Sequence, residues 1–111
     1  MGYTHYWKSE GFTNEEWDQL TRGVKEILAK TDVPLAGDNG GGTPEITDSH
    51  VWLNGVGDDG HETFYLTDEP TKFEFCKTAH KPYDEVVVAI LKLAKETVNT
   101  FNPSSDGGDI F

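Results

Sequence analysis

The chain has 111 residues and a formal net charge of −11, from 20 acidic and 9 basic side chains. A chain of this length forms one domain, residues 1–111, with a single core to which its 12% aromatic content contributes large buried surfaces. Because binding to nucleic acid or to anionic membranes depends on Lys and Arg, the acidic balance argues against both partners.

The first predicted element is a strand over residues 2–8, where aromatic and β-branched residues alternate. This alternation places His5 on one face with Tyr3 and Trp7. Two interpretations of His5 follow. It is either a histidine at the edge of the core with its own hydrogen-bond partner, or part of the wall of a ligand pocket.

The second predicted element is a helix that ends near Lys30. Thr13 and Glu16 have the spacing of a capping box, and Phe12 and Trp17 are placed to form a hydrophobic staple around it. Apolar residues then recur at helical spacing, with charged residues between them. The pattern predicts a helix that packs on a sheet and takes no part in chemistry.

A glycine-rich segment, residues 37–44, interrupts this periodicity. Glycine-rich loops can bind phosphate, but no Gly-Lys-Ser/Thr sequence follows here and no helix begins directly after it. The composition therefore favours a flexible connecting loop, and any functional role would be that of a mobile flap.

A β-hairpin is predicted next. Residues 50–54 and 62–67 have strand composition, and the turn-forming residues 55–61 between them favour an antiparallel connection.

The hairpin turn also contains a cluster of acidic and histidine side chains: Asp58, Asp59, His61 and Glu62. Their spacing matches neither a calcium loop nor a zinc motif, and Asp is common in turns because its side chain bonds its own backbone. We expect turn structure here, keep these residues only as the weaker alternative of a metal site, and predict no cofactor.

The last elements predicted are a fourth strand over residues 72–77 and a helix over residues 82–101, with Pro82 in its first turn. The helix has a broad apolar face, which indicates a central place in the core or an interface, including a homodimer. Residues 103–111 form a turn-like tail that docks back on the domain. The resulting fold class is α+β, an antiparallel sheet of about four strands with two helices packed on it.

Several motifs together resemble a widespread, uncharacterised family of small bacterial and phage proteins. They are Gly2-Tyr-Thr-His-Tyr-Trp7, Asp58-Asp59 with His61-Glu-Thr-Phe64, Phe75-Cys-Lys-Thr78 with Lys81-Pro-Tyr-Asp84, and Ser104-Ser-Asp-Gly107. The resemblance covers most of the chain. It implies a compact protein often carried by phages, and it assigns no catalytic residue.

Basic residues gather at the predicted start of the last helix, where Lys77 and Lys81 flank Thr78 and His80. A helix N-terminus presents free N–H groups and a partial positive charge, which suits an anion. This cluster is either an internal ion-pair hub or an anion pocket with a wall for a flat ring. The residues predicted to bind such a nucleotide-like ligand are His5, Tyr6, Trp7, His61, Lys77, Thr78, Lys81 and Tyr83.

Two functional hypotheses follow. The first is a binder of a small anionic ligand that, in a phage setting, would sequester a nucleotide signal of the host defence in the host-cell cytoplasm. The second is a small hydrolase or transferase for a similar ligand, with Cys76 or His61 as the reacting residue. Cys76 is the only cysteine, so no internal disulfide forms, and a reducing cytoplasm is expected. A buried, inert thiol is the simpler interpretation of Cys76.

Overall fold

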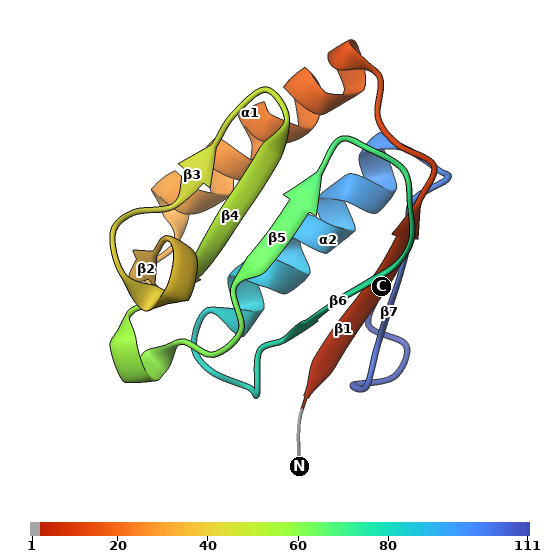
Figure 1. The fold of residues 1–111 in the computed structure, drawn as a ribbon. Coiled ribbons are helices and arrows are strands. Elements are labelled where there is room, and N and C mark those ends of the chain that lie inside the picture. Colours follow the sequence, from red (N-terminus) through yellow and green to blue (C-terminus); the bar gives the residue numbers. More distant parts are fainter. Residues whose placement is uncertain (1–2) are drawn as a thin grey trace.

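A computed structural model describes residues 3–111, so Gly2, the first residue of the predicted opening strand, lies outside it. Figure 1 shows two helices that lie behind a layer of strands. In chain order the elements are β1 (Thr4–Ser9), α1 (Asn14–Lys30), β2 (Leu35–Ala36), β3 (Glu45–Ile46), β4 (His50–Gly55), β5 (Phe64–Thr67), β6 (Thr71–Lys77), α2 (Asp84–Thr97) and β7 (Asn102–Ser105).

The strands form two antiparallel sheets. One has the order β6-β1-β7, and in the other β4 pairs with β2, β3 and β5. The predicted hairpin is present, since Val51 of β4 lies opposite Leu66 of β5. Two helices packed on antiparallel strands confirm the α+β fold class.

The start of α1 agrees with the prediction in detail. Thr13 accepts the Glu16 N–H at 3.1 Å, and the Glu16 carboxylate accepts the Thr13 N–H at 2.8 Å. The rings of Phe12 and Trp17 meet edge to face, with centroids 5.3 Å apart. These contacts lie within a few residues of one another, so local sequence determines them.

The C-terminal region differs from the prediction. Helix α2 ends at Thr97 instead of residue 101, and the segment predicted as a tail contains β7, which pairs with β1 along its whole length. β1 therefore lies between β6 and β7, and β7 forms an edge of this sheet. Pro103 is tolerated in β7 because an edge strand has N–H groups that need no partner. The tail then returns to the domain, where Phe111 packs against the core.

The glycine-rich segment is more structured than a flexible loop. The short strands β2 and β3 flank it, and a 3-10 turn over Asp38–Gly40 lies within it. Asn39 occupies the left-handed region at φ 58°, and its N–H donates to Thr63 Oγ1 at 2.9 Å. With β2, β3 and β7 included, residues 3–111 contain seven strands where four were predicted.

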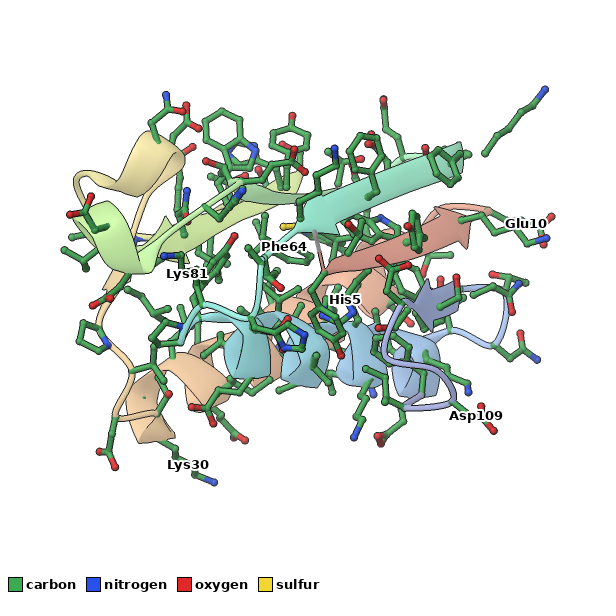
Figure 2. All side chains as sticks on the ribbon, turned by 90° about the horizontal axis from the view of Figure 1, so that it is seen from below. His5, Glu10, Lys30, Phe64, Lys81 and Asp109 are labelled. Carbon is green, nitrogen blue, oxygen red and sulfur yellow. The ribbon has the colours of Figure 1, made fainter. Side chains whose placement is uncertain are left out.

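The core lies between the strands and the helices, where His5 and Phe64 are placed in Figure 2. Alternation along β6 turns Cys76 inward and leaves Phe73 and Phe75 on the opposite, exposed side. Neither helix of the described residues is long and apolar enough to cross a membrane.

Candidate ligand-binding site

The predicted anion pocket at the start of α2 is filled by the chain itself. The N–H of Asp84 donates to Lys81 O at 2.9 Å, and the N–H of Val86 donates to Tyr83 O at 3.0 Å. The buried hydroxyl of Thr78 donates to the Asp84 carboxylate. An acidic side chain already occupies the positive end of the helix, so few donors remain there for a ligand.

The two lysines that were predicted to flank this pocket have different surroundings. Lys77 is exposed, with Nζ 5.8 Å from the centre of the Phe75 ring, while Lys81 follows a turn in which Ala79 and His80 have positive φ. Neither lysine lines any of five surface hollows of residues 3–111. Figure 2 shows Lys81 near the end of the molecule where α2 begins.

Three further residues predicted to bind ligand lie in the core: His5, Trp7 and Tyr83. His5 Nε2 lies 2.6 Å from Asp84 Oδ1 and Nδ1 lies 2.9 Å from Ser105 Oγ, so the ring has partners on both nitrogens. The Tyr83 hydroxyl donates to Glu62 O at 2.5 Å. All three side chains are enclosed, and those of His5 and Tyr83 are hydrogen-bonded, which fits the interpretation of His5 as a core histidine.

The weaker metal candidates do not converge. Asp58 and Asp59 lie in a 3-10 turn, the Glu62 carboxylate accepts the Lys77 N–H at 3.0 Å, and the side chain of His61 is exposed. In the part of the chain that the structure describes, no three His, Cys, Asp or Glu side chains are placed to hold a metal ion.

Cys76 has the environment of an unreactive thiol. Its side chain is fully buried and its Sγ donates to Glu62 O at 3.5 Å. Burial, reinforced by the charge of Glu62, raises the pKa of the thiol to about 12. The thiolate is the nucleophilic form, so this environment favours the inert interpretation of Cys76.

The solvent-facing side of the β6-β1-β7 sheet carries an aromatic cluster that the sequence analysis did not assign to the site as a group. Tyr6 lies opposite Phe75 on β6 and Ser104 on β7, and its ring centroid lies 5.8 Å from that of Phe73. Phe73 is 62% exposed and Phe75 is 41% exposed. Figure 2 shows side chains projecting from the strand layer on the side away from the helices. Exposed aromatic groups of this kind mark interaction sites.

Lysine side chains lie beside the aromatic cluster. Lys8 and Lys72 line two adjoining hollows of about 470 and 430 Å³, and Lys77 lies over Phe75. Within residues 3–111 none of the three has a carboxylate within 4.0 Å. We call these two hollows together the outer-face site. The hollow of about 470 Å³ is lined by Tyr6, Trp7, Lys8, Lys72, Phe73, Asn102, Pro103 and Ser104. The hollow of about 430 Å³ is lined by Lys8, Ser9, Glu10, Thr71, Lys72, Thr100 and Asn102.

Tyr6 is held at the aromatic end of the outer-face site by the C-terminal turn. Its hydroxyl donates to Asp106 Oδ1 at 3.0 Å, and this hydrogen bond to a carboxylate raises the pKa of Tyr6. The phenol therefore stays neutral and its ring keeps a fixed position. Of the residues predicted to bind ligand, Tyr6 and Trp7 line the site and Lys77 lies next to it, at Phe75.

A second aromatic cluster lies on the other sheet, formed by His50, Trp52 and Tyr65. His50 Nε2 contacts Glu45 Oε2 at 2.5 Å, so this cluster has an acidic neighbour instead of free lysines. It lines none of the five hollows of the described residues. Of the two clusters, the one on β1 and β6 has the charges that suit an anion.

Comparisons of the chain with protein-family models, with curated proteins and with solved structures gave no match.

Proposed function

We propose that the protein binds a small anionic ligand with a flat ring, of nucleotide-like chemistry, on the outer face of the β6-β1-β7 sheet. The observation that carries this proposal is the meeting of Tyr6 and Phe73 with Lys8 and Lys72 along one hollow. An aromatic face stacks with a ring, and unpaired lysines form charge-assisted bonds with phosphate oxygens.

The order of residues along β1 suggests how a ligand lies there. Tyr6 is at the aromatic end, Lys8 follows it, and Glu10, the residue just after β1 ends, is at the far end. The four residue steps from Tyr6 to Glu10 cover at most roughly 13 Å, because an extended residue advances about 3.3 Å. This length suits a base, a sugar and one or two phosphates. The Glu10 carboxylate repels a longer polyphosphate, so we expect mono- and diphosphates to be preferred.

The overall charge favours a small ligand over a nucleic acid. The −11 net charge repels a polyanion along its whole length, whereas a short ligand contacts only the local lysines. Exposed aromatic side chains on a sheet are also used to stack single bases. The outer-face site combines this stacking surface with a basic area just large enough for one or two phosphates.

Binding without turnover is the activity that the outer-face site supports best. The residues that line its two hollows include no histidine and no cysteine. A phosphate held there has no neighbouring imidazole or thiol to act as a base or a nucleophile. In the phage setting that the family resemblance implies, such a protein would sequester a signalling nucleotide and release it unchanged.

The test is calorimetric titration with adenosine, AMP, ADP and ATP. We expect AMP and ADP to bind best, adenosine to bind weakly, and Lys8→Ala and Lys72→Ala each to weaken ADP binding by about 10-fold or more. Lys92→Ala is the matched control, since Lys92 is an exposed lysine on α2. Equal affinities in all variants, or binding that ignores phosphate, would refute the proposal.

A second experiment separates a binder from an enzyme. The protein is incubated with ADP and then denatured, and the released nucleotide is analysed by mass spectrometry. Recovery of intact ADP is expected, and conversion to a new species would contradict binding without turnover. Native mass spectrometry of protein purified from its host would show which small molecule it carries.

A further inference from the structure

A line of three side chains connects the sheet to the start of α2 on the side opposite the outer-face site. Ser105 Oγ lies 2.9 Å from His5 Nδ1, and His5 Nε2 lies 2.6 Å from Asp84 Oδ1. The three residues come from β7, β1 and α2, and strand pairing places Ser105 directly opposite His5. Figure 2 shows His5 between the strand layer and the helices.

The hydrogen-bond partners assign the protons. Asp84 Oδ1 also accepts the Thr78 hydroxyl, so this carboxylate accepts two hydrogen bonds. A carboxylate has no proton to give, so His5 Nε2 carries the hydrogen of the short contact. The neutral ring then has its lone pair on Nδ1, and the Ser105 hydroxyl donates to it. A hydroxyl that donates to an imidazole oriented by a carboxylate is the arrangement that activates a serine.

We propose that Ser105, His5 and Asp84 form a nucleophilic serine site that cleaves small esters. Ser105 is the nucleophile, His5 the general base, and Asp84 the residue that positions His5. The site lies on the helix side of the sheet, so it does not depend on ligand binding at the outer face.

The chemistry balances with water as the second reactant. Ser105 Oγ forms a bond to the ester carbonyl carbon while its proton passes to His5 Nδ1. The bond from carbon to the alcohol oxygen breaks, and the alcohol leaves with the proton from His5. Water then attacks the acyl-serine in the same way, and the carboxylic acid leaves.

The surroundings of Ser105 limit the acyl group. Ser105 is partly exposed on the edge strand β7, and the rings of Tyr3 and Phe111 lie beside His5 with centroids 5.0 and 5.9 Å away. The Gly107 N–H donates to Ser105 Oγ at 2.9 Å and holds this oxygen in place. Because these rings flank the site, we expect acetyl esters, which have the smallest common acyl group, to be the preferred substrates.

Diisopropyl fluorophosphate tests the nucleophile directly, because Oγ displaces fluoride and the serine proton passes through His5 to solvent. Intact-mass analysis and peptide mapping should find one adduct per chain, at Ser105. Ser105→Ala should abolish it, and Ser49→Ala, which removes an exposed serine hydroxyl on the loop before β4, should leave it unchanged. Heat-denatured protein should not be labelled.

A kinetic measurement completes the test. With p-nitrophenyl acetate, the wild-type chain should release a burst of about one p-nitrophenol per chain, and Ser105→Ala should show none. Asp84→Asn should slow the burst at least 100-fold if it folds, and Ser105→Ala decides the question if it does not. If Ser105, His5 and Asp84 only stabilise the fold, Ser105→Ala will have a lower melting temperature. The wild-type chain will then show neither labelling nor a burst. That result, or labelling at another residue, would overturn the proposal.

Discussion

The start of α2 and the outer face of the β6-β1-β7 sheet both combine aromatic and charged residues. They differ in whether their polar groups already have partners within the chain. At the start of α2, the Asp84 carboxylate accepts hydrogen bonds from the His5 ring and the Thr78 hydroxyl. On the outer face, Lys8 and Lys72 have no acidic partner within 4.0 Å among residues 3–111. The first region is closed by its own contacts, and the second is left open.

This difference favours the outer face as the region that gains free energy from an anionic ligand. A group that is already hydrogen-bonded must break a contact before it can make another, whereas an exposed lysine or aromatic ring gives up only water. A dense cluster of functional residue types in the sequence is therefore a poor guide to a site when the fold pairs those residues with one another.

The largest effect on stability is expected at the closed region. Asp84→Ala removes the acceptor of His5 and Thr78, and leaving these buried donors unpaired should cost about 3 kcal/mol of unfolding free energy. Glu85→Ala, next to it but exposed, should cost less than about 1 kcal/mol. Urea denaturation measures both values. Similar small losses would show that the start of α2 is not held by these contacts.

A smaller, pH-dependent effect is expected from the buried thiol. The pKa of Cys76 rises from 9.0 to about 12 on folding, so above pH 9 the unfolded chain binds fewer protons than the folded one. Stability should be unaffected by this thiol below pH 9 and should fall as pH rises from 9 toward 12, by up to about 1.4 kcal/mol per pH unit. Urea denaturation of wild type and Cys76→Ala between pH 8 and 10 checks this. Parallel pH profiles would contradict it.

On the open face, a substitution should change binding more than stability. Phe73→Ser removes a ring that is 62% exposed, so the free energy of unfolding should change by at most about 0.5 kcal/mol. ADP affinity should fall about 10-fold, because stacking on one aromatic side chain contributes about 1–3 kcal/mol. Tyr65→Ser, at a 43% exposed ring outside the hollows, is the control and should bind ADP normally. Equal affinity losses in both variants would argue against a defined site.

The smallest effect is expected for Tyr6→Phe. The change removes the hydrogen bond to Asp106 at the surface but keeps the ring, so the free energy of unfolding should change little. ADP affinity should stay within about 3-fold of wild type if Tyr6 acts through its ring. A 10-fold loss would show instead that the hydroxyl contacts the ligand.

The sequence predicts those parts of the fold that depend on neighbours in the chain. The capping box of Thr13 and Glu16 places the start of α1, and alternation places β4 and β5. β7 could not be predicted in this way. It contains Asn, Pro and two Ser, which have little strand propensity, and it is a strand because it pairs with the open edge of β1.

The candidate site was harder to predict for a related reason. Lys77 and Lys81 are close in sequence, but Lys77 ends β6 beside Phe75, and Lys81 lies beyond a turn in which Ala79 and His80 have positive φ. Lys8 and Lys72 are distant in sequence and become neighbours only through the pairing of β1 with β6, which contains an irregularity after Trp7. The only local signal was the alternation of Phe73 and Phe75 with Cys76, which indicates an exposed aromatic face once the thiol is known to be buried.

The most direct test of the open-face account is a map of amide chemical shifts during titration with ADP. We predict shifts concentrated in β1, β6 and β7, around Tyr6, Lys8 and Phe73, with the amides of residues 78–84 unchanged. Shifts centred on residues 78–84, or no shifts at millimolar ADP, would contradict it.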